Sequence, residues 1–267
     1  MKDNSKPIFS QNLYLFPMIF TAGNMLCGVL SIVLSIRGDF TKAAWLIIIG
    51  MIFDGLDGLI ARAQKITSFL GVELDSLSDF TTFCIAPIIL IWQLVMYRYK
   101  LPGVIVCFIY VFFGAVRLAR FNLAAYFNKD NISKFIEGLP TPAAAGVIVS
   151  VVLLFGFLNP DVPVSRKHIT FLITLIPWIL NFLPGIILLL ALLMITKIRY
   201  PKVNNFKLTQ RVSFRLFSLI LVGVLLLIAY PESSIFIIFS IYLLYGLVEY
   251  MFRKYKIFKE RKKYQDV

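Results

Sequence analysis

Histidine and cysteine are scarce in this sequence, and charged residues are few. One histidine (His168) and three cysteines occur in 267 residues, and the cysteines are odd in number without metal-site spacing. We therefore expect Cys27, Cys84 and Cys107 to be small buried apolar residues. Only 15% of the chain is charged while 59% is hydrophobic, with a mean hydropathy of +0.84. This balance excludes an ordinary soluble globular protein.

Hydrophobic runs of about 20 residues, the length that crosses a bilayer as a helix, recur along the chain. We predict eight spans, at residues 14–36, 40–61, 77–97, 101–121, 139–158, 169–195, 213–230 and 233–252. Pro177 and Pro184 are expected to kink or break the sixth. The predicted fold class is all-α: a polytopic membrane helical bundle of about eight transmembrane helices, forming a single integral membrane domain over residues 1–267.

Basic residues exceed acidic ones, 27 to 14, which gives a formal net charge of +13. They flank the predicted spans instead of forming one soluble patch, so anionic lipid headgroups explain them better than nucleic acid. Most lie in segments on one side of the spans, which the positive-inside rule makes cytoplasmic together with both termini. We expect a protein of the cell (inner) membrane, whose basic cytoplasmic tail (253–267) lies along the inner surface or is simply solvated.

Acidic residues gather at the ends of two strongly hydrophobic segments, in the stretch DGLDGLIARAQKITSFLGVELDSLSD that begins at Asp54. Carboxylates are costly beside lipid and mark functional sites there. On a helix with about 100° per residue, Gly58 and Ala61 both fall within roughly 40° of Asp54, with Asp57 and Arg62 on either side. The small residues leave a trough in which a flat ligand can approach the backbone.

The next helix places Asp75 and Asp79 one turn apart, so two antiparallel helices bring four carboxylates together near the cytoplasmic membrane surface. Unpartnered carboxylates repel, and divalent cations relieve this. Oxygen-only ligands suit Mg²⁺ or Mn²⁺, and two such ions can clamp a diphosphate while Arg62 holds phosphate oxygens. A site with four carboxylates, bound divalent cations and an arginine suits a phosphoryl-type transfer to an alcohol. A cation pathway or proton relay is the alternative of another class.

The same residues match the pattern D-x-x-D-G-x-x-A-R, eight residues, then G-x-x-x-D-x-x-x-D at every fixed position. This pattern resembles the signature of the CDP-alcohol phosphotransferases, integral membrane enzymes of phospholipid synthesis. The resemblance implies that Asp54, Asp57, Asp75 and Asp79 bind metal, that Asp79 is also the base toward the acceptor hydroxyl, and that Arg62 is catalytic. The implied contacts to CDP-diacylglycerol are Thr21, Asn24, Asp54, Gly58, Ala61, Arg62, Ser68 and Gly71.

Thr21 and Asn24 come from a first-span pattern, P-N-x-x-T-x-x-N, in which this chain lacks one asparagine because Met18 follows Pro17. A simple polar pair on a lining helix is the other interpretation of these two residues.

Two further stretches, RLARFN from Arg117 and FIEGLPTPAAAG from Phe135, look like the phosphatidylserine synthase branch of the family. The likeness covers about the first 160 residues, with a catalytic core at 14–160 and additional spans at 169–252. Arg117 and Arg120 present two guanidiniums from one helix face, which suits a serine carboxylate; positive-inside anchoring is the alternative.

The resemblance implies transfer of a phosphatidyl group from CDP-diacylglycerol to the hydroxyl of L-serine, giving phosphatidylserine and CMP. It also implies membrane lipids as partners and a homodimer. A sibling enzyme that uses glycerol 3-phosphate or an inositol phosphate is the first alternative, and a cation or proton transporter is the second.

Overall fold

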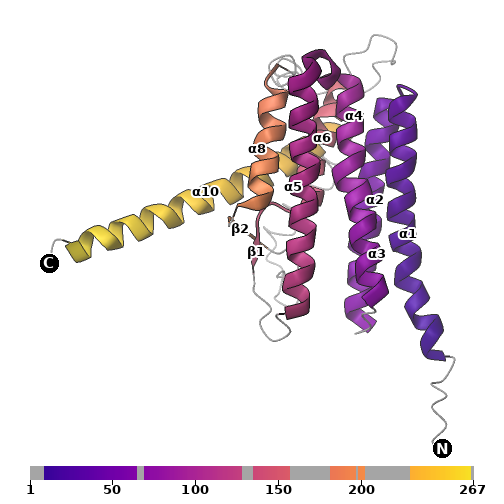
Figure 1. The fold of residues 1–267 in the computed structure, drawn as a ribbon, viewed down its shortest axis with the longest axis horizontal. Helices are drawn as coiled ribbons and strands as arrows, with labels where there is room; N and C mark the ends of the chain where they lie inside the picture. Colours follow the sequence, from indigo (N-terminus) through magenta and orange to yellow (C-terminus); the bar gives the residue numbers. More distant parts are fainter. Residues whose placement is uncertain are drawn as a thin grey trace, which may run out of the picture. The chain divides into compact units, whose positions relative to one another are not determined.

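The computed structural model describes residues 9–64, 69–127, 135–156, 181–196, 198–201 and 229–265, and these are overwhelmingly helical (Figure 1). The all-α prediction is confirmed, with a single pair of three-residue strands as the exception within the described part. The chain forms two compact units, Met1–Asn122 and Leu123–Val267, and each is described by itself.

The first unit is a run of long helices joined by short turns. Its elements are α1 (Phe9–Ile36), α2 (Phe40–Gln64), α3 (Phe69–Asp79), the π-helical segment η1 (Phe80–Ile85), α4 (Ala86–Leu94), the 3₁₀ helix η2 (Met96–Tyr99) and α5 (Lys100–Phe127) as far as Asn122. Helix α1 packs against α2, α3, η1 and α4, and Figure 1 shows α1 beside α2. Gly38 has φ 86°, a left-handed conformation that closes the tight turn between α1 and α2.

Helices α3 and α4 form one continuous element because η1 joins them without a break. The amide of Ala86 bonds to the carbonyl of Thr81, five residues back, as a π-helix requires. Pro87 follows and has no amide proton to donate to the preceding turn. The buried Tyr110 hydroxyl on α5 donates to the Phe83 carbonyl in that turn at 3.2 Å. A side chain from α5 thus supplies a donor where the proline removes one.

The second unit contains β1 (Phe135–Glu137), α6 (Thr141–Phe155), α8 (Leu183–Ile195), β2 (Arg199–Pro201) and α10 (Pro231–Gln265). Strands β1 and β2 pair antiparallel, with Ile136 opposite Tyr200. Gly138, which follows β1, has φ +82°, and a Cβ there would lie 2.3 Å from the Met194 carbonyl oxygen. The glycine of the EGLPTP stretch therefore lets β1 approach the end of α8 closely, before Pro140 caps α6.

Within the described residues, five helical stretches are long and apolar enough to cross a membrane: Met18–Ile36, Phe40–Ile60, Phe69–Leu94, Met96–Ala124 and Pro231–Tyr255. They match the first four predicted spans and the last one, and the chain is an integral membrane protein by this pattern. Many large apolar side chains on these helices are exposed, as lipid-facing residues are.

The remaining predicted spans have other outcomes. The span at 139–158 is a 15-residue apolar helix, α6, and the described part of 169–195 is the 13-residue α8. Pro184 lies in the first turn of α8 and begins that helix instead of kinking it, because a first-turn amide needs no partner. Pro177 and nearly all of the predicted span at 213–230 lie outside the described residues.

Two predicted boundaries were wrong. Helix α3 begins at Phe69 and not at residue 77, the predicted start of the third span, so Asp75 lies inside the helix. Helix α5 runs to Phe127, so Arg117 and Arg120 lie within it instead of at its end. The basic tail also starts as a direct continuation of the last span, since α10 is unbroken from Pro231 to Gln265.

Candidate functional site

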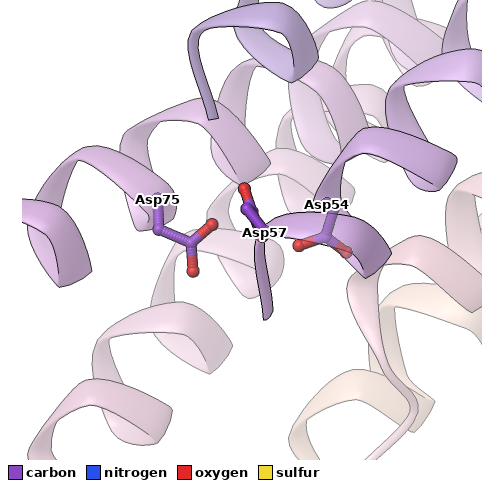
Figure 2. Close-up of side chains that lie close together, drawn as sticks. All are labelled: Asp54, Asp57 and Asp75. Atoms are coloured by element: carbon purple, nitrogen blue, oxygen red, sulfur yellow. The ribbon is translucent and has the colours of Figure 1, made fainter. Parts of the chain in front are cut away.

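Three carboxylates from two helices form the centre of the site. Asp54 and Asp57 come from α2 and Asp75 from α3, and Figure 2 shows the Asp75 carboxylate directed toward that of Asp57. One carboxylate oxygen of each lies within 4.8 Å of the others. Asp57 is buried, and the other two are half-buried. The predicted meeting of these acids across two helices is therefore present in the structure.

The donor set fits a hard divalent cation. Each of the three residues offers a carboxylate oxygen, the ligand that Mg²⁺ and Mn²⁺ prefer. Within the described part of the chain, Oδ1 of Asp75 is buried and has no hydrogen-bond partner. A buried carboxylate oxygen without a partner is costly, and a bound cation would remove that cost. The three cysteines are buried and free, as expected, and none belongs to this group.

Asp79 lies one helical turn beyond Asp75, at the last residue of α3, and does not belong to the group of three. The negative charges of Asp54, Asp57 and Asp75 nevertheless act on its carboxylate, so all four acids share one electrostatic environment. Its Oδ1 accepts a hydrogen bond of 3.1 Å from the side-chain amide of Asn24 on α1.

Helix α1 contacts the acids through both residues that were singled out in the first span. Thr21 donates from Oγ1 to Oδ2 of Asp57 at 3.0 Å, and Asn24 donates to Asp79. Sequence reasoning assigned both to the nucleotide. The structure shows both side chains hydrogen-bonded to carboxylates, because the register of α1 against α2 and α3 brings donors and acids to the same level.

Two hydroxyls that sequence reasoning missed fix this register. Ser78 Oγ donates to the Thr21 carbonyl at 3.0 Å, and Thr82 Oγ1 donates to the Asn24 carbonyl at 2.9 Å. Both hydroxyls are buried and lie four residues apart, which places them on one face of the continuous element. The i, i+4 spacing of these two hydroxyl residues inside an apolar run was the sequence signal from which their role could have been predicted.

Most of the remaining predicted nucleotide contacts lie in the last two turns of α2 and the first turn of α3. Gly58 and Gly71 are half-buried. Ala61 and Arg62 belong to the last turn of α2, and their side chains are outside the described part of the structure. Ser68 lies outside the described residues.

The predicted acceptor residues on α5 differ from each other in burial. Arg117 is half-buried and Arg120 is exposed. The charges of both Arg117 and Asp79 act on Cys84, so Arg117 lies near the π-helical segment η1 that follows Asp79. Helix α5 is also tied to α3 next to Asp75, because the Asn122 amide donates to the Ser76 hydroxyl at 2.8 Å. Sequence reasoning quoted Asn122 but gave this pair no role.

Comparison with known proteins agrees with this site. Residues 14–196 match the family described as CDP-alcohol phosphatidyltransferase. A protein of Helicobacter pylori strain J99 named CDP-diacylglycerol–serine O-phosphatidyltransferase is 36% identical over 94% of this chain and 97% of its own length.

Two archaeal relatives are more distant. A protein of Methanocaldococcus jannaschii with the same name is 32% identical over 85% of this chain and 90% of its own. The archaetidylserine synthase of Methanothermobacter thermautotrophicus is 33% identical over 71% and 70%. The match over residues 14–196 includes the whole aspartate signature, and the chain belongs to the CDP-alcohol phosphatidyltransferase family.

Proposed function

We propose that this protein transfers the phosphatidyl group of CDP-diacylglycerol to the hydroxyl of L-serine, giving phosphatidylserine and CMP. The observation that carries the proposal is the group formed by Asp54, Asp57 and Asp75, with Asp79 beside it. The names of relatives that cover nearly the whole chain support serine as the acceptor.

The acids divide into two roles. Asp54, Asp57 and Asp75, with Asp79, would hold Mg²⁺ or Mn²⁺, two ions in all, whose charge would offset that of the diphosphate. Asp79 accepts the proton of the serine hydroxyl while the serine oxygen forms a bond to the lipid-bearing phosphorus. The bond from that phosphorus to the CMP oxygen breaks, and CMP leaves with the electron pair.

The nucleotide lipid lies against the end of α2 in this mechanism. Gly58, Ala61 and Gly71 leave room for the CDP group beside the backbone, and Ser68 adds a hydroxyl. Arg62 donates to the phosphate oxygens and balances the charge on departing CMP. The lipid tails enter from the inner leaflet between helices, and both termini and the active site face the cytoplasm of the cell (inner) membrane.

Arg117 and Arg120 bind the serine carboxylate in this proposal, and the nearness of Arg117 to the segment that follows Asp79 supports it. Residues 1–267 act as one integral membrane enzyme with a catalytic core at 14–160, and it works as a homodimer.

A direct test uses the purified protein with CDP-diacylglycerol, Mn²⁺ or Mg²⁺, and one labelled acceptor at a time. Serine should give labelled phosphatidylserine and an equal amount of CMP. Glycerol 3-phosphate and inositol phosphate should give background. Transfer to either phosphorylated acceptor in preference to serine contradicts the serine assignment. Cation or proton flux in proteoliposomes without any CMP release contradicts the enzyme assignment.

A further inference from the structure

Asn24 has no accessible surface in the structure, although it is polar and lies among the acids. A nucleotide has no atom of this side chain to touch. Thr21, one turn earlier, is also buried. Burial therefore argues against the direct CDP contact that the sequence pattern suggested for Asn24, and its hydrogen bond to Asp79 needs a different explanation.

We propose that Asn24 is a positioning residue for Asp79: its amide holds one carboxylate oxygen and leaves the other to receive the proton of the acceptor hydroxyl. This inference rests on the proposed function and deepens it. The bond joins Nδ2 of Asn24 to Oδ1 of Asp79 at 3.1 Å. A carboxylate that accepts a charge-assisted bond at one oxygen no longer turns freely about its last side-chain bond, so Oδ2 keeps one direction.

The orientation of the amide is determined by its surroundings. Turning it over would place its carbonyl oxygen against a carboxylate, which repels it. In the orientation found, Asn24 Oδ1 is buried and, among the described residues, has no hydrogen-bond partner. An unpaired buried oxygen costs free energy that an apolar side chain of the same size would avoid. The donor function of Nδ2 explains why an amide occupies this position.

The neighbouring helices hold Asn24 in place. Thr82 donates to the Asn24 carbonyl at 2.9 Å, and Ser78 does the same for Thr21. Two glycines permit this close packing, since a Cβ at Gly28 would lie 2.5 Å from the Thr82 hydroxyl and one at Gly50 would lie 3.0 Å from Asn24 Oδ1. The Asn24 amide that donates to Asp79 is thus held in a tightly packed interface between α1, α2 and α3. Positioning of a reacting group requires such a rigid support.

Thr21 provides a matched comparison on the same helix. It makes the equivalent bond to Asp57, which belongs to the three-carboxylate group, whereas Asp79 does not. Loss of the Thr21 donor should therefore weaken the tightest metal site, which these three acids form, whereas loss of the Asn24 donor leaves the three acids in place and should mainly disturb proton transfer. Substitutions at Thr21 and Asn24 therefore test the functions of Asp57 and Asp79 separately, because each removes the buried hydrogen-bond donor of one acid.

The experiment measures kcat, both Michaelis constants and Mn²⁺ affinity by electron paramagnetic resonance for Asn24→Leu and Thr21→Val. Asn24→Leu should lower kcat about ten- to a hundredfold while the KM for CDP-diacylglycerol and the tightest Mn²⁺ affinity stay within about threefold. Thr21→Val should weaken Mn²⁺ binding by about tenfold or more.

Three outcomes would overturn the inference: an unchanged kcat in Asn24→Leu, a large rise in its KM for CDP-diacylglycerol at constant kcat, or a loss of Mn²⁺ binding equal to that of Thr21→Val. Retained Mn²⁺ binding also shows that the variant is folded. Asn24→Ala, which adds no atoms, gives the same comparison if the leucine does not fit. A wild-type protein that releases no CMP with any acceptor would contradict the proposed function itself, and that result is distinguishable from all three.

Discussion

The Tyr110 hydroxyl on α5 and the Phe83 carbonyl in the π-helical segment are joined by a 3.2 Å hydrogen bond, just before the proline that interrupts the backbone pattern. Tyr110→Phe removes this donor and leaves a buried carbonyl short of a partner. We expect a loss of about 1–3 kcal/mol in the free energy of unfolding, measured by thermal or denaturant unfolding in detergent. Tyr97→Phe is the control, because Tyr97 is 52% exposed. Equal stability of both variants would mean that the bond contributes nothing.

Asp75 is the acid whose loss should affect the site most directly, because its buried Oδ1 has no partner within the described part of the chain. Asp75→Asn should lower CMP release by about a hundredfold or more while the size-exclusion profile stays unchanged. Asp39→Asn is the matched control, since Asp39 is exposed and pairs with Lys42 at 3.5 Å. A folded Asp75→Asn enzyme with normal turnover would remove the metal proposal.

Metal binding should also be visible without activity. A ligand that binds only the folded state raises its stability, by about 2.7 kcal/mol at a hundredfold excess over Kd. Mn²⁺ should therefore raise the unfolding temperature of the EDTA-treated wild-type protein and should raise that of Asp57→Asn much less. The same shift in both proteins would place the stabilising cation somewhere other than the three-carboxylate group.

Two glycines of α2 should respond oppositely to alanine. A Cβ at Gly50 would lie 2.7 Å from Thr82 Cγ2, a branched side chain with little freedom to move, whereas nothing lies within 4 Å of one at Gly55. Gly50→Ala should cost about 1–3 kcal/mol of stability and lower kcat by displacing Asn24. Gly55→Ala should be neutral or stabilising by up to about 1 kcal/mol. Unfolding curves that rank the two variants the other way would contradict the described packing of α1 on α2.

The two arginines of α5 differ in burial, so we expect substitutions at them to affect the KM for serine differently. Arg117→Lys keeps the charge but loses the planar donor fork, so the KM for serine should rise by up to about tenfold with the KM for CDP-diacylglycerol unchanged. Arg120→Lys should have a smaller effect because Arg120 is exposed. Serine kinetics that are unchanged in both variants would favour membrane anchoring as the role of this helix face.

Sequence periodicity predicted the acid group well because it is local in origin. The spacing of Asp54 and Asp57 places both near the end of one helix, and a short connection returns the chain so that Asp75 meets them. Long-range register was not predictable in this way. Neither the bond from Thr21 to Asp57, 36 residues away, nor that from Asn24 to Asp79, 55 residues away, follows from the period of one helix.

Helix boundaries and irregular segments were harder to predict for a related reason. Hydropathy places Phe80–Ile85 inside a span but carries no information on whether the backbone is α or π there. The end of α5 was also missed, because Arg117 and Arg120 were taken as the end of an apolar run when the helix continues to Phe127. A charged residue ends the apolar part of a span, but the hydrogen-bonded helix can continue beyond it.

A π-helical turn is geometrically an α-helix that holds one additional residue. Deleting any one of Phe80–Ile85 would allow α3 and α4 to run as a single regular helix. The side chains after the deletion would keep nearly their present directions relative to Asp75 and Asp79, because the π turn already takes up the additional residue. Deleting a second residue would rotate α4 by about 100° and turn its buried side toward lipid. Alignments of relatives should therefore tolerate a gap of one residue in this segment, but not a gap of two.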